Sequence, residues 1–102
     1  MTLSVAGLTF AIQPVRVKYP PGYTKTFQVA VLTGCVARHP NCKLAKAKNL
    51  IGMEVASVNG ATLDPAQGRL RQIGEAFRHG DVSVELYRRD GADTATVTFS
   101  HR

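Results

Sequence analysis

The sequence lacks the features that mark several large protein classes. No apolar run approaches the roughly 20 residues that a membrane-spanning helix needs, and the start at Met1–Val5 has neither the basic segment nor the long apolar run of a signal peptide. Internal repeats and low-complexity runs are also absent. A chain of 102 residues with 44% hydrophobic side chains is enough for one core. We therefore expect residues 1–102 to form a single domain.

Cysteine is scarce, since only Cys35 and Cys42 are present, seven positions apart. A disulfide framework usually has more cysteines in a chain of this length. The sequence therefore predicts two free thiols, and with them a cytoplasmic or other reducing location. Together with His39 these cysteines could supply three metal ligands, but a structural zinc site needs four at tighter spacing, so no metal site is predicted.

Residue patterns that carry catalysis are missing as well. None of the three histidines lies in a nucleophile motif such as G-x-S-x-G, and the seven carboxylates form no evident acid–base pair. A glycine-rich phosphate loop is absent. The sequence therefore predicts a protein that is not an enzyme and that holds no cofactor.

Acidic residues are outnumbered, and the net charge is +6. The basic residues gather at Lys43, Lys46 and Lys48, at Arg69, Arg71 and Arg78, and at Arg88 and Arg89. Such clusters can meet phosphate, anionic lipid or an acidic peptide, and they can equally be a solvated face. Because no stacking aromatics are interleaved with the charges, we do not expect nucleic acid to bind, and any contact with a membrane surface is expected to be weak and peripheral.

Several segments of the sequence have the residue patterns of β-strands. Leu8–Ile12 alternates large and small apolar residues, and Pro14 is expected to limit its extension. The segment 19–23 is predicted to be a loop rich in turns. Phe27–Leu32 and Met53–Val58 are apolar and β-branched enough to be further strands.

A long helix is predicted next. Asp64 suits an N-cap, Pro65 suits the first helical position, and apolar residues follow at helical spacing as far as Arg78. A shorter helix is expected near Leu44–Lys48. Two alternating segments, 82–86 and 94–99, flank a hairpin signal at Asp90–Gly91.

The predicted order is therefore β, β, short α, β, α, β, β. It indicates an α+β fold that is mainly β. The expected architecture is a small antiparallel β-sandwich or partly open barrel of five to six strands, capped by one long and one short helix.

Gly52-Met53-Glu54-Val55-Ala56-Ser57-Val58-Asn59-Gly60 resembles the "G-D-x-I-x-x-V-N-G" element of PDZ domains, although Met53 replaces the usual aspartate. Val31–Arg38 resembles the "V-x-P-G-S-P-A-A" corner of that family, and Ala6–Phe10 resembles its "G-L-G-F" loop with Thr9 in place of the second glycine. The chain is most similar to the circularly permuted PDZ domains of serine proteases of the high-temperature-requirement type.

The resemblance implies a non-catalytic scaffold or regulatory module. It would bind the C-terminal or an internal extended peptide of a partner by β-strand addition, between the strand 8–12 and the helix 65–78. It assigns the carboxylate-binding loop to Ala6, Gly7, Leu8 and Thr9, with Pro20-Pro21-Gly22-Tyr23 as a rival, and the peptide groove to Phe10, Ile12, Leu70, Ile73, Gly74 and Phe77.

Leu70 stands where the family often has a histidine that reads the third-from-last ligand residue. The expected ligand is therefore apolar at its last and third-from-last positions. Each of these apolar residues could equally be plain core.

Two alternatives stay open. One is a PDZ-like structural or oligomerisation domain whose groove is degenerate or closed, with self-association through an edge strand. The other is a basic surface that binds anionic lipid or nucleic acid.

Overall fold

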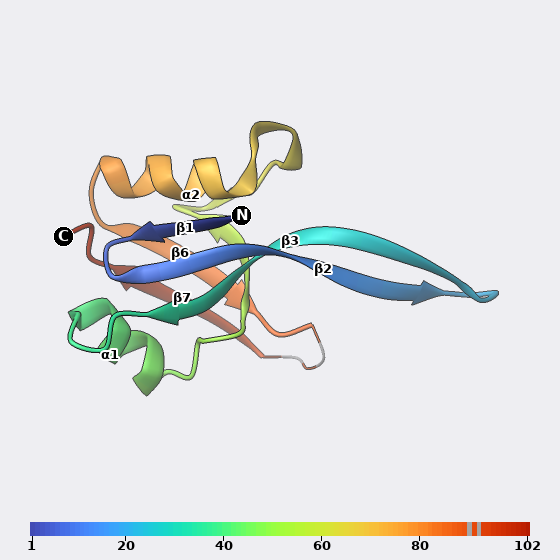
Figure 1. Ribbon diagram of the computed structural model, residues 1–102, viewed down its shortest axis with the longest axis horizontal. Coiled ribbons are helices and arrows are strands. Elements are labelled where there is room, and N and C mark those ends of the chain that lie inside the picture. The colour runs from blue at the N-terminus through green and yellow to red at the C-terminus, as the bar shows by residue number, and fades with distance from the viewer. Residues whose placement is uncertain (90, 92) are drawn as a thin grey trace.

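A computed structural model describes residues 1–89, 91 and 93–102 (Figure 1). It contains an antiparallel sheet of seven strands in the order β1-β2-β3-β4-β6-β7, with β5 paired to β4. The strands are β1 (Thr2–Val5), β2 (Leu8–Tyr19), β3 (Tyr23–Cys35), β4 (Glu54–Val58), β5 (Ala61–Thr62), β6 (Val82–Tyr87) and β7 (Thr94–Phe99). The expected mainly β class is confirmed, but the sheet is a single open one with more strands than predicted. Asp90 of the predicted hairpin signal lies outside the described residues.

The core is built by alternation along the strands. Val82, Val84 and Leu86 of β6 are buried, whereas Ser83, Glu85 and Tyr87 between them are more exposed. Side chains of a strand point alternately to opposite faces, so one face of the sheet collects the apolar residues. Phe10, Leu32, Val84 and Phe99 meet in this core and are completely buried.

Helix α2 (Arg69–Arg78) covers the core with the apolar stripe that the sequence predicted. Asp64 caps a short 3₁₀ turn, Pro65–Gln67, by accepting a hydrogen bond from the Ala66 N–H. Gly68, with φ of 80°, separates that turn from α2. The long helix 65–78 is therefore two segments joined at a glycine.

Helix α1 (Pro40–Ala47) begins earlier than the expected 44–48. Pro40 occupies the first turn, where its missing N–H costs no helical hydrogen bond. His39 takes the N-cap position, and its ring Nδ1 accepts a hydrogen bond from the Asn41 N–H at 3.0 Å. An imidazole in this role is outside the usual capping residues, which is why the sequence placed the start too late.

Strands β2 and β3 form a hairpin far longer than predicted, and its outer part projects from the body (Figure 1). The expectation that Pro14 limits the first strand was wrong, because β2 continues to Tyr19. Strand β1 pairs with β2 only as far as Ala11. Beyond Ile12, whose N–H donates to the Met1 carbonyl, one edge of β2 is free, so a proline at position 14 need not remove a ladder hydrogen bond.

The two cysteines form a disulfide, Cys35–Cys42, which joins the end of β3 to α1. The prediction of free thiols was wrong, because the turn after β3 brings residues seven apart to a Cα separation of 5.2 Å. A disulfide is typical of an oxidising rather than a reducing compartment, so it speaks against the expected reducing location. Among the described residues, no helix is long and apolar enough to cross a membrane.

Candidate functional site

Strand β1 lies between β2 and α2, in the space where the resemblance placed a bound peptide (Figure 1). It runs antiparallel to β2 with Leu3 opposite Phe10 and Val5 opposite Leu8. Opposite residues of a strand pair share a face, so Leu3 and Val5 point toward the core and pack against it. No strand was predicted in this segment.

The expected open edge at Leu8–Ile12 is therefore not present. Between Leu8 and Ala11, β2 pairs with β1 on one side and with β3 on the other. At Ile12 the backbone N–H donates to the Met1 carbonyl at 3.3 Å. The chain's own β1 takes the main-chain partners that an added peptide would use, and β1 becomes the outer strand of the sheet.

The contact between β1 and α2 is made at a glycine. A Cβ placed on Gly74 would lie 3.6 and 3.7 Å from the two methyl carbons of Leu3. The absence of a side chain at Gly74 leaves room for a large aliphatic residue from the neighbouring strand. What remains open above the two elements is a shallow hollow of about 380 Å³, lined by Met1–Val5 and by Leu70, Arg71, Gly74, Glu75 and Arg78.

The predicted groove residues fall into two groups. Four of them are buried and belong to the core, which was the alternative left open for the apolar residues: Phe10, Leu70, Ile73 and Phe77. Gly74 and Ile12 are only partly buried. Leu70 and Gly74 both border the hollow beside β1, so these two residues of the predicted set lie where a strand meets the helix.

The predicted carboxylate-binding loop is a tight hairpin turn. Ala6 and Gly7 join β1 to β2 with φ values of 50° and 76°, the positive pair that a type I′ turn requires. Leu8 and Thr9 are already part of β2. Because Val5 continues directly into this turn, the chain's own backbone stands where a terminal carboxylate was expected.

Gly7 is needed for a different reason than the one expected. A Cβ at this position would lie 2.3 Å from Cγ of His39, so the imidazole packs directly on the glycine backbone. The close approach that a glycine permits is made here by a side chain of the same protein.

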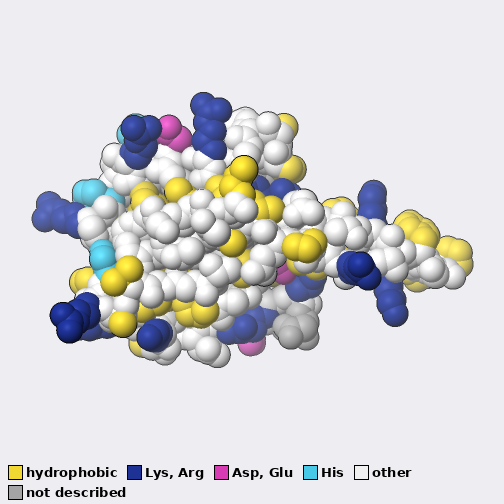
Figure 2. Space-filling model, in the orientation of Figure 1, with side chains coloured by type: hydrophobic (Ala, Val, Ile, Leu, Met, Phe, Trp, Pro, Cys, Tyr) yellow, Lys and Arg dark blue, Asp and Glu magenta, His cyan; other side chains and the backbone are white. Residues whose placement is uncertain are grey.

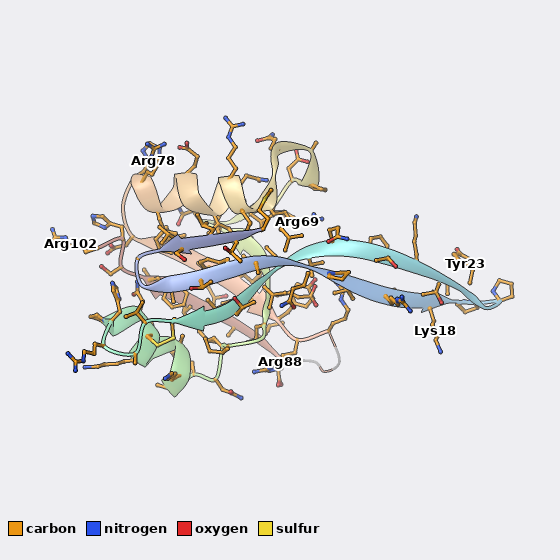
Figure 3. The ribbon with its side chains drawn as sticks, viewed as in Figure 1. Lys18, Tyr23, Arg69, Arg78, Arg88 and Arg102 are labelled. Atoms are coloured by element: carbon orange, nitrogen blue, oxygen red, sulfur yellow. A yellow bond between two sulfur atoms is a disulfide. The ribbon has the colours of Figure 1, made fainter. Side chains whose placement is uncertain are left out.

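The rival loop, Pro20-Pro21-Gly22-Tyr23, is not near the helix. It forms the tip of the β2–β3 hairpin, at the far end from α2 (Figures 1 and 3). The Gly22 N–H donates to the Tyr19 carbonyl at 2.7 Å, which closes the turn. This segment therefore has no helix beside it to form a groove.

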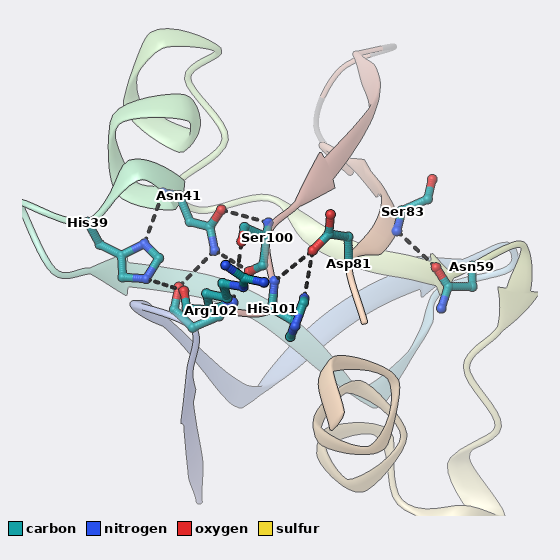
Figure 4. Close-up of polar contacts among 9 residues, drawn as sticks. His39, Asn41, Asn59, Asp81, Ser83, Ser100, His101 and Arg102 are labelled. Carbon is teal, nitrogen blue, oxygen red and sulfur yellow. Dashed lines mark hydrogen bonds and ion pairs between the residues drawn. The ribbon is translucent and has the colours of Figure 1, made fainter. Parts of the chain in front are cut away.

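Asn41 ties the β1–β2 turn to the rest of the protein and was missed by the sequence analysis (Figure 4). It is 3% exposed, and its side-chain amide donates to the carbonyls of Ala6 and Ser100 at 2.8 and 2.7 Å. Its Oδ1 accepts from the Ser100 N–H at 2.9 Å. Close by, His39 Nε2 lies 2.7 Å from the Arg102 carbonyl. No sequence signal distinguishes such an asparagine from one in a loop, since its partners are 35 and 59 residues away.

A second polar cluster lies at the base of the projecting hairpin. Glu54 is buried and accepts hydrogen bonds from Arg89 at 2.8 and 3.0 Å and from the Tyr87 hydroxyl at 3.0 Å. Burial and the bond to Glu54 raise the pKa of Tyr87, and the bond to Glu54 raises the pKa of Arg89. Both oxygens of the Glu54 carboxylate are thus paired.

The contact between Leu3 and Gly74 can be tested by a substitution that changes the free energy of unfolding. Gly74→Ala should raise the free energy of unfolding by about 0.5–1 kcal/mol, because alanine restricts the unfolded chain and favours a helix interior. The new methyl group would meet Leu3 at an ordinary contact distance, so it should not push β1 away. Urea unfolding followed by circular dichroism measures the change. A loss of stability would show that β1 lies closer to α2 than described.

Comparison of the chain with protein-family models, with curated proteins and with solved structures found no match. The case for a function therefore rests on the residues and their geometry.

Proposed function

We propose that the protein is a non-catalytic, PDZ-like interaction module that binds an extended segment of a partner beside β2, and that β1 occupies this site in the structure. The observation that carries the proposal is the position of β1, which is paired with Leu8–Ala11 while Leu3 rests against Gly74. Strand addition takes its affinity from main-chain hydrogen bonds and its specificity from alternate side chains. β1 provides both.

The order of the elements also supports a PDZ-like module. Helix α1 lies between β3 and β4, and α2 lies between the short strand β5 and β6. This is the order from which the sequence resemblance was drawn, now with β1 added in front of it and the short β5 added before α2. The helix α2 and the strand β2 are the two elements that the resemblance assigned to the groove walls.

The residues of β1 indicate which partner segment would fit. Leu3 and Val5 face inward, while Thr2 and Ser4 are exposed. The resemblance alone led to a ligand that is apolar at its last and third-from-last positions, and Val5 and Leu3 have that spacing. We therefore propose that the partner contributes an extended strand with two aliphatic residues two positions apart. Because the chain itself continues past Val5, an internal segment fits as well as a free C-terminus.

Displacement of β1 is the step that would admit a partner. The strand has four residues and lies at the sheet edge, with Leu3 and Val5 as its apolar anchors. A binding-competent state that is rarely populated lowers the apparent affinity in proportion to its population. The intact protein should therefore bind weakly, and a protein with a weakened β1 should bind more tightly.

The test uses Leu3→Ser combined with Val5→Ser, and a fluorescent peptide Met-Thr-Leu-Ser-Val carrying a C-terminal amide. Replacing two half-buried aliphatic anchors should favour opening enough to raise peptide affinity at least about tenfold over the unchanged protein. Fluorescence polarisation measures the affinity. The free-acid peptide should bind about as well as the amide.

Two controls make this result specific. The peptide Met-Thr-Ser-Ser-Ser should not bind, because it lacks both anchors. Adding Gly74→Leu to the weakened protein should abolish binding, since the new side chain fills the space that Leu3 occupies. If the weakened protein remains folded and binds no peptide, the groove is closed permanently and the domain serves a structural or assembly role instead.

A further inference from the structure

The outer part of the β2–β3 hairpin, residues 14–28, is an arm that extends beyond the body of the protein (Figure 1). The molecule measures 47 Å along its longest axis and 28 and 23 Å along the others. The arm is ordered by its own cross-strand pairs, among them Tyr19 with Tyr23 and Val15 with Phe27. Aromatic and β-branched pairs stabilise such a ribbon. Its length is not required by the groove described above.

The tip of the arm, residues 20–23, is apolar and exposed, and Tyr19 beside it is partly buried (Figure 2). Tyr23 is 59% exposed, and among the described residues only Met1 and Val36 are also large, hydrophobic and exposed. Pro20 and Pro21 are exposed beside it. The rings of Tyr19 and Tyr23 stack on one another with centroids 5.5 Å apart. The tip therefore exposes an apolar surface to solvent, and the tyrosine stack supports this surface.

Three cations stand directly behind the tip, at Arg16, Lys18 and Lys25, and all are exposed. Figure 3 shows Lys18 pointing away from the arm, and the Lys25 ammonium lies 5.8 Å from the centroid of Phe27. None of the three is within ion-pair distance of a described Asp or Glu. The sequence contains no acidic residue before Glu54. Every charged residue of the arm is therefore a cation.

The order of these groups fits an anionic bilayer surface. Strand residues are about 3.3 Å apart, so Arg16 lies roughly 10 Å behind Tyr19. Amphipathic elements at a membrane bury their apolar part about 5–10 Å into the boundary of headgroups and acyl chains. An inserted tip would place Arg16, Lys18 and Lys25 at the level of the lipid phosphates. A single-stranded nucleic acid would instead need open ring faces for stacking, and the Tyr19–Tyr23 stack already covers one face of each ring.

We propose that this arm is a membrane-contact element. The tip enters the interface of an anionic bilayer, and the three cations bind its lipid headgroups. Tyrosine suits this place because its ring is apolar while its hydroxyl remains hydrated. Each cation near such a surface contributes independently to binding. The arm and the peptide groove lie on different parts of the molecule, so this inference does not depend on the proposed function.

The charge test compares two triple variants with the same change in net charge. Arg16→Gln, Lys18→Gln and Lys25→Gln together should weaken binding to vesicles of phosphatidylcholine with 30% phosphatidylserine about 100-fold at low salt. The matched control is Lys43→Gln, Lys46→Gln and Lys48→Gln, which removes three exposed cations from α1 and the residue after it. It should weaken binding less than tenfold. Sedimentation of vesicles with bound protein measures both.

The insertion test uses the absence of tryptophan from the sequence. Tyr23→Trp places a single reporter at the tip, and Val36→Trp places one at a similarly exposed site, 61% exposed, away from the arm. Anionic vesicles should shift the emission of the tip tryptophan to shorter wavelength and leave that of the control unchanged.

Three results would overturn the proposal. In the first, both triple variants lose binding equally, which would show that only net charge matters. In the second, the tip tryptophan does not shift on vesicles. In the third, a single-stranded oligonucleotide binds with the same dependence on the arm cations while anionic vesicles do not bind.

Discussion

Gly7→Ala should lower the free energy of unfolding by about 3–4 kcal/mol. An L-residue held at a φ of 76° costs about 1–2 kcal/mol. The new methyl would also lie 2.3 Å from His39 Cγ, so the imidazole must leave its place. That movement removes its bonds to the Asn41 N–H and the Arg102 carbonyl, each contributing about 1 kcal/mol. Urea unfolding at equilibrium measures the loss.

Gly60 serves as a control that separates the cost of backbone strain from the cost of the steric clash with His39. Asn59 and Gly60 form a second turn with φ values of 50° and 80°, almost the same as those of Ala6 and Gly7. No atom lies within 4 Å of a Cβ placed on Gly60. Gly60→Ala should therefore cost only the strain, about 1–2 kcal/mol. Equal losses in the two variants would mean that His39 does not pack on Gly7 in solution.

These two turns also show which parts of the fold can be predicted from the sequence and which cannot. The turn at Asn59–Gly60 can be recognised from the sequence, because Asn-Gly is the strongest short signal for a type I′ hairpin. Ala6 and Gly7 adopt the same backbone, but alanine seldom takes a positive φ, so nothing marked the turn. Once that turn was missed, the alternation of Leu3 and Val5 with Thr2 and Ser4 was not recognised as a strand. The expected open groove followed from this one omission.

Other parts were predictable because their cause is local. The cap at Asp64 and the apolar spacing of Leu70, Ile73 and Phe77 depend on residues a few positions apart. The spacing is confirmed, and Asp64 is a cap, although of the 3₁₀ turn before α2 rather than of α2 itself. The disulfide and the contacts of Asn41 depend on how distant segments meet. In the arm, the turn at residues 19–23 was predicted, but Pro14 was expected to limit the first strand, whereas cross-strand pairs such as Val15 with Phe27 continue the ribbon beyond it.

Asn41→Ala should lower the free energy of unfolding by about 2–3 kcal/mol. The substitution leaves the carbonyls of Ala6 and Ser100 and the N–H of Ser100 without their partner in a partly buried place. An unsatisfied buried polar group costs about 1–3 kcal/mol. Alanine is the better helix former by about 0.5 kcal/mol, so a protein without this network would be stabilised by the same change. The sign of the effect therefore decides whether the network forms.

Where in the fold Asn41→Ala reduces stability is as informative as how much stability it removes. Asn41 holds the Ala6 carbonyl, and that residue turns β1 back along β2. Without this bond, the amides of β1 should exchange with deuterium faster than those of β6 and β7, because local opening needs less energy than global unfolding. Lys43→Ala, at an exposed position of the same helix, should change neither stability nor exchange by a measurable amount. If Asn41→Ala accelerated exchange equally in all strands, the asparagine would stabilise the whole fold rather than hold β1 against β2 in particular.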